Sequence, residues 1–148
     1  MSMPGFEQTT PYLKALPTRL LAIAGVRGSS ISRAALAEHG SGQFEFSVMV
    51  TLAEYGAVSQ AELCRRTGLD RKDVATVVLT LEQAGHVART ADAGDARRKI
   101  VSLTAEGQSR FSRLRQVADD SQDRALAMLS ESERATLVAL LQKILAAD

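Results

Sequence analysis

The chain has 148 residues, of which 45% are hydrophobic and 24% charged, and its net charge is only +1. This length and composition are typical of one folded domain and argue against a disordered chain. No apolar run approaches the roughly 18 residues of a membrane span, and the N-terminus lacks a secretory signal pattern, so we expect a cytoplasmic protein without a membrane partner.

The N-terminal part of the sequence is predicted to be helical. Thr10 followed by Pro11 is typical of a helix start, because Thr caps the first turn and Pro fits the first helical position. Pro17 predicts a kink or a delayed start, since proline lacks the amide hydrogen that an α-helix needs. An apolar stripe at helical spacing follows and includes Leu13, Leu16 and Leu20. A further helix is expected to end at Gly56.

A helix-turn-helix is predicted after residue 58. Ser59 and Glu62 have the spacing of a capping box, in which each side chain accepts a hydrogen bond from the other residue's backbone amide. Gly68 is expected to end that helix in the left-handed conformation, and Asp70 to cap the next one. Two short helices joined in this way can place the second one in the major groove of DNA.

Two strands with a polar tip are predicted to follow the second helix. Residues 86–90 and 98–103 have the residue types of strands, and residues 91–96 between them are rich in turn formers. A hairpin after a helix-turn-helix forms a wing, so the fold class is mainly α with a small β-hairpin wing.

The C-terminal part is predicted to contain two more helices. Thr104 is expected to cap one, and Ser130 with Glu133 has the capping-box pattern for the other. The last helix carries a stripe of large apolar residues, namely Leu137, Leu140, Leu141, Ile144 and Leu145. Few later residues remain to cover this stripe, which favours a homodimer, although both terminal stripes can also complete a monomeric core.

Basic residues are concentrated in the middle of the chain. Residues 59–115 contain 11 basic and 7 acidic residues, a net charge of +4, whereas the rest of the chain has 7 basic and 10 acidic residues, a net charge of −3. A basic module of this kind suits binding to nucleic acid through one face, although chance clustering on a solvated surface would look the same.

Five segments together resemble the MarR family of transcriptional regulators. They are residues 52–56, 59–63, 81–87, 92–98 and 101–107, whose order and residue types match the family's pattern over nearly the whole chain. The resemblance implies one domain over residues 1–148. Residues 10–39 and 104–148 would form dimerisation helices, and residues 43–103 a winged helix-turn-helix lobe.

The resemblance and the helical periodicity together indicate which residues meet DNA. In the second helix, the outward-facing residues are expected to include Arg71, Lys72, Ala75 and Thr76, whereas the opposite stripe is buried. In the wing, Arg97 is expected to enter the minor groove, and Arg98 and Lys99 lie beside it. The resemblance implies that Asp92 or Asp95 holds the wing in shape. The expected partner is a pseudo-palindromic operator in double-stranded DNA.

MarR-like proteins often bind small aromatic anions between the dimerisation helices and the DNA-binding lobe. The residues that the sequence offers for such a cleft are Tyr12, Arg19, Phe44, Phe46 and Phe111. Aromatic walls with one cation suit an aromatic carboxylate. The aromatic residues can equally belong to the core, and Arg19 can equally pair with an acidic residue across a dimer.

No pattern of catalytic residues is visible, so we do not expect an enzyme. His39 and His86 lack neighbouring metal ligands, and neither a metal nor another cofactor is expected. Cys64 is interpreted as a packed structural thiol rather than a redox sensor. The sequence therefore predicts a sequence-specific DNA-binding regulator, most readily a repressor. The alternative is a helical protein-interaction module that uses a winged-helix fold without DNA.

Overall fold

Proline and capping residues determine where the N-terminal helices begin. The computed structural model describes residues 5–147, and residues 1–4 and 148 of the expected domain lie outside that part. The hydroxyl of Thr10 accepts a hydrogen bond from the amide of Leu13 at the start of helix α1 (Pro11–Lys14). Leu16 is then extended, with ψ of 112°, and α2 (Pro17–Glu38) begins at the proline. The predicted delayed start at Pro17 is confirmed.

Within residues 5–147 the chain forms seven helices and three short strands. After α1 and α2 the elements are, in chain order, α3 (Gln43–Tyr55), β1 (Val58–Ser59), α4 (Gln60–Thr67), α5 (Arg71–Gln83), β2 (Val87–Ala91), β3 (Lys99–Leu103), α6 (Ala105–Ala125) and α7 (Glu131–Leu145). The predicted mainly helical fold with a β-hairpin is confirmed. No helix in this range is both long and apolar enough to cross a lipid bilayer.

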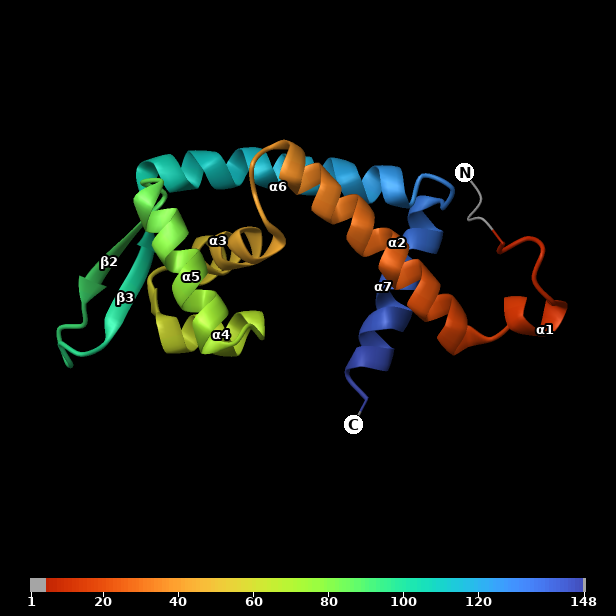
Figure 1. Ribbon diagram of the computed structural model, residues 1–148, viewed down its shortest axis with the longest axis horizontal. Coiled ribbons are helices and arrows are strands. Elements are labelled where there is room, and N and C mark those ends of the chain that lie inside the picture. Colours follow the sequence, from red (N-terminus) through yellow and green to blue (C-terminus); the bar gives the residue numbers. More distant parts are fainter. Residues whose placement is uncertain (1–4, 148) are drawn as a thin grey trace.

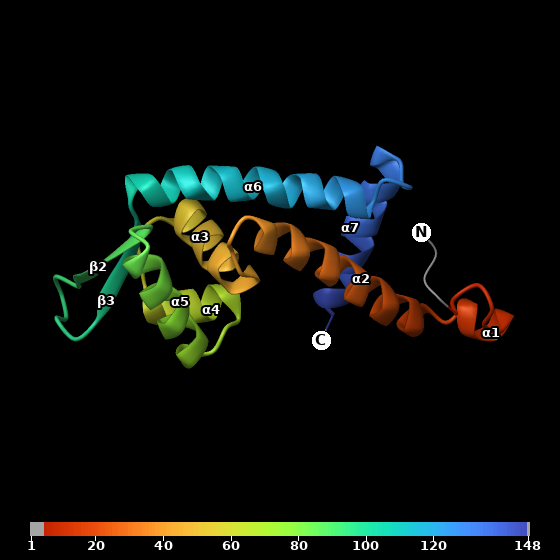
Figure 2. The same cartoon turned by 45° about the horizontal axis from the view of Figure 1, so that its top comes forward.

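The molecule has a compact lobe at one end and a helical arm at the other. Figure 1 shows α3, α4, α5 and the strands gathered in the lobe, with α1, α2 and α7 in the arm. Helix α6 runs along both parts, and the turned view of Figure 2 shows the same arrangement. Gln122 of α6 donates a hydrogen bond to the Ser32 hydroxyl of α2 at 3.2 Å, which ties the arm to the long helix.

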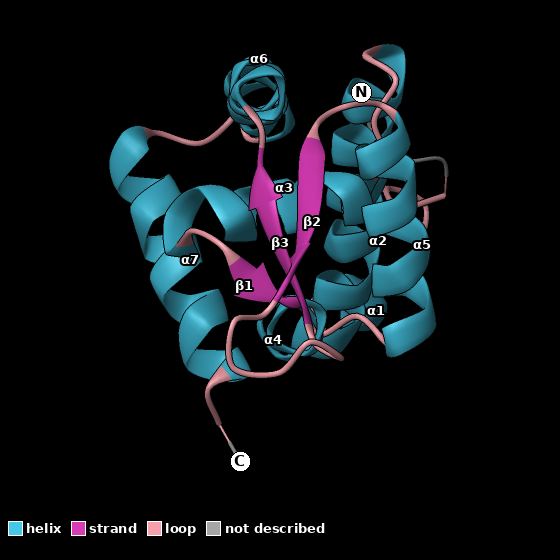
Figure 3. Ribbon diagram, turned by 90° about the vertical axis from the view of Figure 1, so that its left-hand side faces the viewer, coloured by secondary structure: helices cyan, strands magenta, loops and turns pink. Residues whose placement is uncertain are grey.

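The sheet is antiparallel, with the strand order β1-β3-β2. Figure 3 shows the long hairpin of β2 and β3 with β1 beside β3. The strands of the predicted hairpin start one residue later than expected, at Val87 and Lys99. The two-residue strand β1, in which Val58 faces Val101, was not predicted. It covers the edge of β3 that the hairpin would otherwise leave open.

The hydrophobic core lies in the lobe and under α6. Its largest fully buried apolar side chains come from α3, α4, α5, β3 and α6, namely Val48, Met49, Leu63, Val74, Val78, Val101 and Leu114. Gly107 lets α6 approach the turn between α5 and β2 closely, because a Cβ at this position would lie 1.9 Å from the carbonyl oxygen of His86. The amide of Gly107 donates to the hydroxyl of Thr104 at 3.0 Å, so Thr104 caps α6 as expected.

Candidate DNA-binding surface and ligand cavity

Helix α5 is held by its cap and by a buried apolar stripe. Gly68 takes a left-handed conformation, with φ of 74°, and ends α4. The carboxylate of Asp70 then accepts a hydrogen bond from the amide of Asp73 at 2.8 Å and starts α5. The stripe that faces the core consists of Val74, Val77, Val78 and Leu81, all of them buried. The opposite side of α5 therefore faces solvent, as the periodicity predicts.

The exposed side of α5 offers two cations near its N-terminus. Arg71, Lys72, Ala75 and Thr76 are all exposed. Within residues 5–147, neither Arg71 nor Lys72 forms an ion pair with an acidic side chain. The N-terminal end of a helix carries a partial positive charge, so two cations there attract an external anion such as a phosphate.

The tip of the wing is shaped by two aspartates. The carboxylate of Asp92 accepts a hydrogen bond from the amide of Gly94 at 2.9 Å. The carboxylate of Asp95 accepts one from the amide of Arg97 at 3.0 Å. Backbone bonds close the same loop, since Asp92 donates to the Arg98 carbonyl at 2.9 Å and Arg98 donates to the Asp95 carbonyl at 3.0 Å. These bonds fix the backbone from which the basic side chains of the wing project.

Three consecutive basic residues follow that turn. The side chain of Arg97 is 95% exposed and lies 3.7 Å from Asp95 at its closest approach. Arg98 is 56% exposed and lies 3.6 Å from Asp92. Lys99 begins β3 opposite Ala91 and is exposed as well. At these distances the aspartates lie near the guanidinium groups without tight hydrogen bonds, so the cations remain accessible to a ligand.

The start of α5 and the tip of the wing lie on the same side of the lobe. In Figures 1 and 2 both point away from α6, which covers the opposite side. The structure therefore brings the two groups of predicted DNA-binding residues to one face. That these residues contact DNA remains a prediction from the sequence.

The capping box predicted at Ser59 is only half formed. The hydroxyl of Ser59 accepts a hydrogen bond from the amide of Glu62 at 3.1 Å. The carboxylate of Glu62 does not return to the cap, because it pairs with Arg65 and, at 2.8 Å, with Arg66. These arginines, Arg65 first, lower the pKa of the Glu62 carboxyl. Arg66 also lies over the ring of Tyr55, 3.7 Å from its centroid. Two of the basic residues counted in the central module thus share one carboxylate within the lobe.

An ion pair between α5 and the wing was not foreseen from the sequence. Arg89 of β2 donates two hydrogen bonds to the carboxylate of Glu82 in α5, at 2.8 and 3.1 Å. The two bonds hold the wing strand against the second helix of the motif, and they lower the pKa of Glu82 below its usual value of 4.5. The only signal for this ion pair in the sequence is the presence of two opposite charges seven residues apart, on either side of a turn.

Replacing Glu82 with Gln is expected to destabilise the fold modestly at neutral pH. Each side chain of the pair is 34% exposed, so solvent screens the attraction and only a small decrease in the free energy of unfolding is expected. Because the folded-state pKa of Glu82 is lowered, the stabilisation is present above pH 4.5 and is lost as the pH falls through the lowered pKa. Urea unfolding of the wild type and variant at neutral and acid pH measures this.

The matched control is a double-mutant cycle with Arg89→Gln. The cycle isolates the coupling between the two side chains from the separate effects of each substitution. A coupling of zero at neutral pH, or a difference between wild type and Glu82→Gln that grows as the pH falls, would contradict the role given to this pair.

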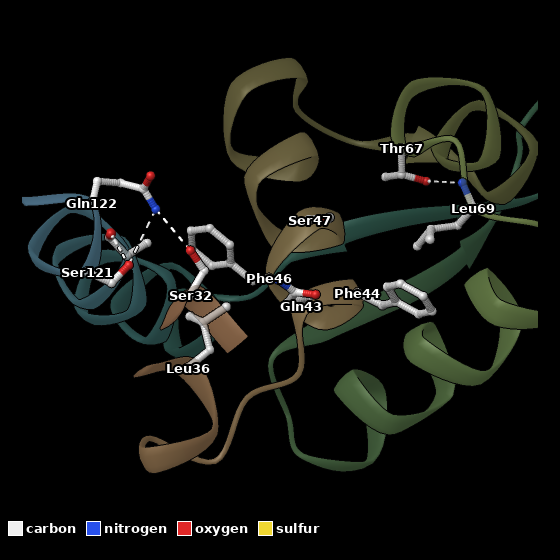
Figure 4. A pocket seen from close by; sticks show the side chains of 11 residues that line it. Ser32, Leu36, Gln43, Phe44, Phe46, Ser47, Thr67, Leu69, Ser121 and Gln122 are labelled. Carbon is white, nitrogen blue, oxygen red and sulfur yellow. Dashed lines mark hydrogen bonds between the residues drawn. The ribbon is translucent and has the colours of Figure 1, made fainter. Parts of the chain in front are cut away.

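A cavity of about 390 Å³ lies where the lobe meets the arm. Its lining comes from α2, α3, α6, the last residue of α4 and the turn that follows it, and includes Phe44 and Phe46 (Figure 4). The structure does not bring the other three predicted cleft residues into this lining. Phe111 is buried in the core, with its ring stacked on Phe46 at 6.3 Å between centroids. This part of the sequence prediction is therefore corrected.

The two N-terminal members of the predicted cleft lie in the arm. Tyr12 belongs to α1 and is 73% exposed, and Figure 1 shows α1 at the end of the molecule far from the lobe. Arg19, near the start of α2, is half-buried and donates a hydrogen bond to the carbonyl of Leu13 at 3.3 Å. Since α2 is 22 residues long, its first turn cannot reach the cavity near its other end.

The arm presents the apolar stripes that were predicted for a dimer interface. No residue of α7 is buried, and Leu140, Ile144 and Leu145 are 54%, 52% and 84% exposed. The other predicted interface residues are half-buried or lie at the edge of exposure, namely Leu13, Leu16, Leu20, Leu137 and Leu141. The capping box of Ser130 and Glu133 is fully formed, and Arg134 ties α7 to Asp123 of α6 at 2.6 Å. The helix is thus well defined while its apolar face stays open.

Cys64 is half-buried and packs against the core of the lobe, in keeping with a structural thiol. In the part of the chain that the structure describes, no three His, Cys, Asp or Glu side chains lie close enough together to hold a metal ion.

Comparison with known proteins identifies relatives of this fold. Residues 41–98 match the model of the MarR family. The chain is 32% identical over 111 residues to the HTH-type transcriptional repressor Rv2887 of Mycobacterium tuberculosis, with 75% of this chain and 80% of the repressor covered. It is 29% identical over 104 residues to the HTH-type transcriptional repressor NicR of Pseudomonas putida, with 70% of this chain covered. The matched region spans 66% of NicR, slightly less than two thirds of its length.

A solved structure matches nearly the whole molecule. Bordetella bronchiseptica BpsR, whose DNA binding is regulated by 6-hydroxynicotinic acid, is similar with a TM-score of 0.81 and 24% sequence identity. The similarity covers 95% of this chain and 100% of that one, and it shows that the lobe and the arm together form a known fold. From the matched family model and the identity to a repressor of comparable length, the chain belongs to the MarR family of winged helix-turn-helix transcriptional regulators.

Proposed function

We propose that this protein binds operator DNA as a homodimer in the cytoplasm and represses transcription. The observation that carries the proposal is the common face formed by the start of α5 and the tip of the wing. Arg71, Lys72 and Arg97 are exposed there on elements that caps and hydrogen bonds hold in place. A helix that enters the major groove and a cation that reaches the adjacent minor groove both require this arrangement. The repressor names of two relatives support the direction of regulation.

A homodimer explains the open apolar face of α7. We propose one domain over residues 1–148, with residues 10–39 and 104–148 forming the dimerisation arm and residues 43–103 the DNA-binding lobe. Two arms that pack together cover the exposed side chains of α7 and present two lobes related by a two-fold axis. Such a dimer binds a pseudo-palindrome whose half-sites are about one helical turn, roughly 10 base pairs, apart or a multiple of that distance.

The test is selection of duplexes from a random DNA pool with the full chain, followed by gel shift with the enriched sequence. A pseudo-palindrome should be enriched, and its affinity should exceed that of unrelated DNA by about 1,000-fold or more at physiological salt. A reporter gene behind the selected site then gives the sign of regulation. If no sequence is enriched and the chain instead captures a protein partner, the alternative of a protein-interaction module is correct.

We also propose that a small aromatic effector controls the affinity of the protein for DNA. The cavity between lobe and arm has the size of a small-molecule site, and its occupant would touch α2 and α6 as well as α3. A ligand that fits one lobe–arm arrangement better than another shifts the population toward it and changes the distance between the two lobes. BpsR, a protein of the same fold, is regulated by an aromatic acid.

A further inference from the structure

The lining of the cavity carries no charge. Eleven described residues form it, and they are apolar, hydroxyl-bearing or amide-bearing, namely Ser32, Leu36, Gln43, Phe44, Phe46, Ser47, Thr67, Leu69, Ala118, Ser121 and Gln122. Figure 4 shows Phe44 and Phe46 from α3 with Ser121 and Gln122 of α6 across from them. The described lining therefore contains no cation that would pair with an aromatic carboxylate.

The hydroxyls that are most tightly held face the cavity as acceptors. Ser121 is 1% exposed and donates its hydroxyl hydrogen to the carbonyl of Ala118 at 2.7 Å. Thr67 donates its hydroxyl hydrogen to the carbonyl of Leu63 at 2.6 Å. Each hydroxyl has one hydrogen and already accepts one hydrogen bond, Ser121 from the amide nitrogen of Gln122 at 3.4 Å and Thr67 from the backbone amide of Leu69 at 3.3 Å. What each offers to a further partner is therefore its remaining lone pair. Lone pairs accept a hydrogen bond from a ligand O–H or N–H and repel a carboxylate.

The remaining polar groups do not supply a substitute for a cation. Gln122 uses its amide nitrogen to donate to the hydroxyls of Ser32 at 3.2 Å and Ser121 at 3.4 Å, as the dashed lines in Figure 4 mark. Gln43 and Ser47 make no side-chain hydrogen bond within residues 5–147, so they can turn toward a neutral ligand. Transferring an ionised carboxylate into such a site is costly, because only neutral dipoles replace its hydration. Transferring a neutral polar group into the same site costs much less hydration free energy.

We propose that the cavity binds a neutral single-ring aromatic molecule with a hydrogen-bond donor, such as a phenol or an aromatic amide, and discriminates against the corresponding carboxylate. This deepens the proposed effector role and rests on it. A volume of about 390 Å³ suits one substituted ring. Phe46 is fixed by its stack on Phe111 and provides a wall for that ring. The aromatic anion expected from the sequence depends on Arg19, which lies outside the lining.

The decisive experiment is isothermal titration of the purified full-length protein with matched ligand pairs at neutral pH. Each isomer of hydroxybenzamide is compared with the same isomer of hydroxybenzoate, since the two differ chiefly in charge. At least one amide is expected to bind at least about tenfold more tightly than its carboxylate and to raise the melting temperature more. A carboxylate that binds as tightly as its amide, or no binding by any member of the set, overturns the inference.

Variants locate the site and distinguish a neutral ligand from an anion that Arg19 would bind. Ser47→Ala and Ser121→Ala should each weaken amide binding, whereas Ser112→Ala, on the exposed surface of α6, should leave it unchanged. Arg19→Gln should leave the ratio of amide to carboxylate affinity unchanged. A selective loss of carboxylate binding in Arg19→Gln would show that the arginine, reached across a dimer, selects an anion.

Gel shift with the selected operator is run in parallel, so that the inference and the proposed function fail separately. If the protein binds its operator but prefers the carboxylate, the proposed DNA-binding function is correct and the inference about the ligand is wrong. If the protein prefers the amide but selects no operator, the ligand preference is correct and the proposed DNA-binding function is wrong.

Discussion

Replacing Ile144 with Asp is expected to convert the dimer into a monomer at micromolar concentration. Ile144 is 52% exposed in the single chain, so an aspartate there leaves the isolated fold intact. In the proposed dimer the same carboxylate is buried against an apolar face without a partner. A penalty of about 4 kcal/mol raises the dissociation constant about 1,000-fold, and burial of one unpaired ion on each subunit reaches at least this value. Sedimentation velocity over a concentration series measures the change.

Gln142→Asp is the matched control. Gln142 is exposed and polar, and two helical positions rotate it about 200° away from the face of Ile144. This variant should remain dimeric, and both variants should keep the helical circular dichroism of the wild type. The dimer interpretation of α7 is wrong if the wild type sediments as a monomer at micromolar concentration. It is also wrong if the Ile144→Asp protein stays dimeric.

The boundaries of the helices could be predicted because they depend on local chemistry. Asp70, Thr104 and Ser130 each cap the helix that follows, through a bond between residues three apart. Gly68 adopts the left-handed conformation that ends α4. Pro17 separates α1 from α2, as its missing amide hydrogen requires. Signals of this kind lie within one turn of the chain, so the sequence displays them directly.

The elements that were missed depend on contacts between distant residues. Strand β1 has only two residues, and Ser59 in it also serves as a helix cap, so no alternating pattern can reveal it. It forms because Val101, more than 40 residues later, presents an open strand edge to Val58. Arg89 pairs with Glu82 for a similar reason, since the turn after α5 folds the strand back along the helix.

The candidate site likewise has one part that the sequence predicts and one part that it does not. The exposure of Arg71 and Lys72 was predictable, because it follows from which side of α5 carries valine and leucine. The lining of the cavity was not predictable, since it combines segments from four parts of the chain. Aromatic residue type drew attention to Phe44 and Phe46, but it said nothing of Ser121. The sequence likewise does not show that the long α2 carries Arg19 away from the lobe.

Replacing Arg97 with Ala is expected to weaken operator binding by at least about tenfold. The side chain is 95% exposed at the tip of the wing and 3.7 Å from Asp95, so its charge is available to DNA. A guanidinium in the minor groove displaces condensed counterions, and each such contact contributes roughly 0.9 to the slope of log affinity against log salt. The dimer carries two copies of Arg97, so the magnitude of the slope should fall by about 2. Fluorescence anisotropy with the selected operator over a salt series measures both quantities.

Arg115→Ala supplies the control for a general loss of positive charge. Arg115 is exposed on α6, which covers the side of the lobe opposite the wing tip. Its removal changes the net charge as much as Arg97→Ala does, yet it should leave the affinity within about twofold and the salt slope unchanged, because a Debye length of about 8 Å screens it from DNA. Equal effects of the two variants would mean that only the overall charge matters. An unchanged affinity in Arg97→Ala would remove the wing from the DNA-binding surface and leave the start of α5 as the contact.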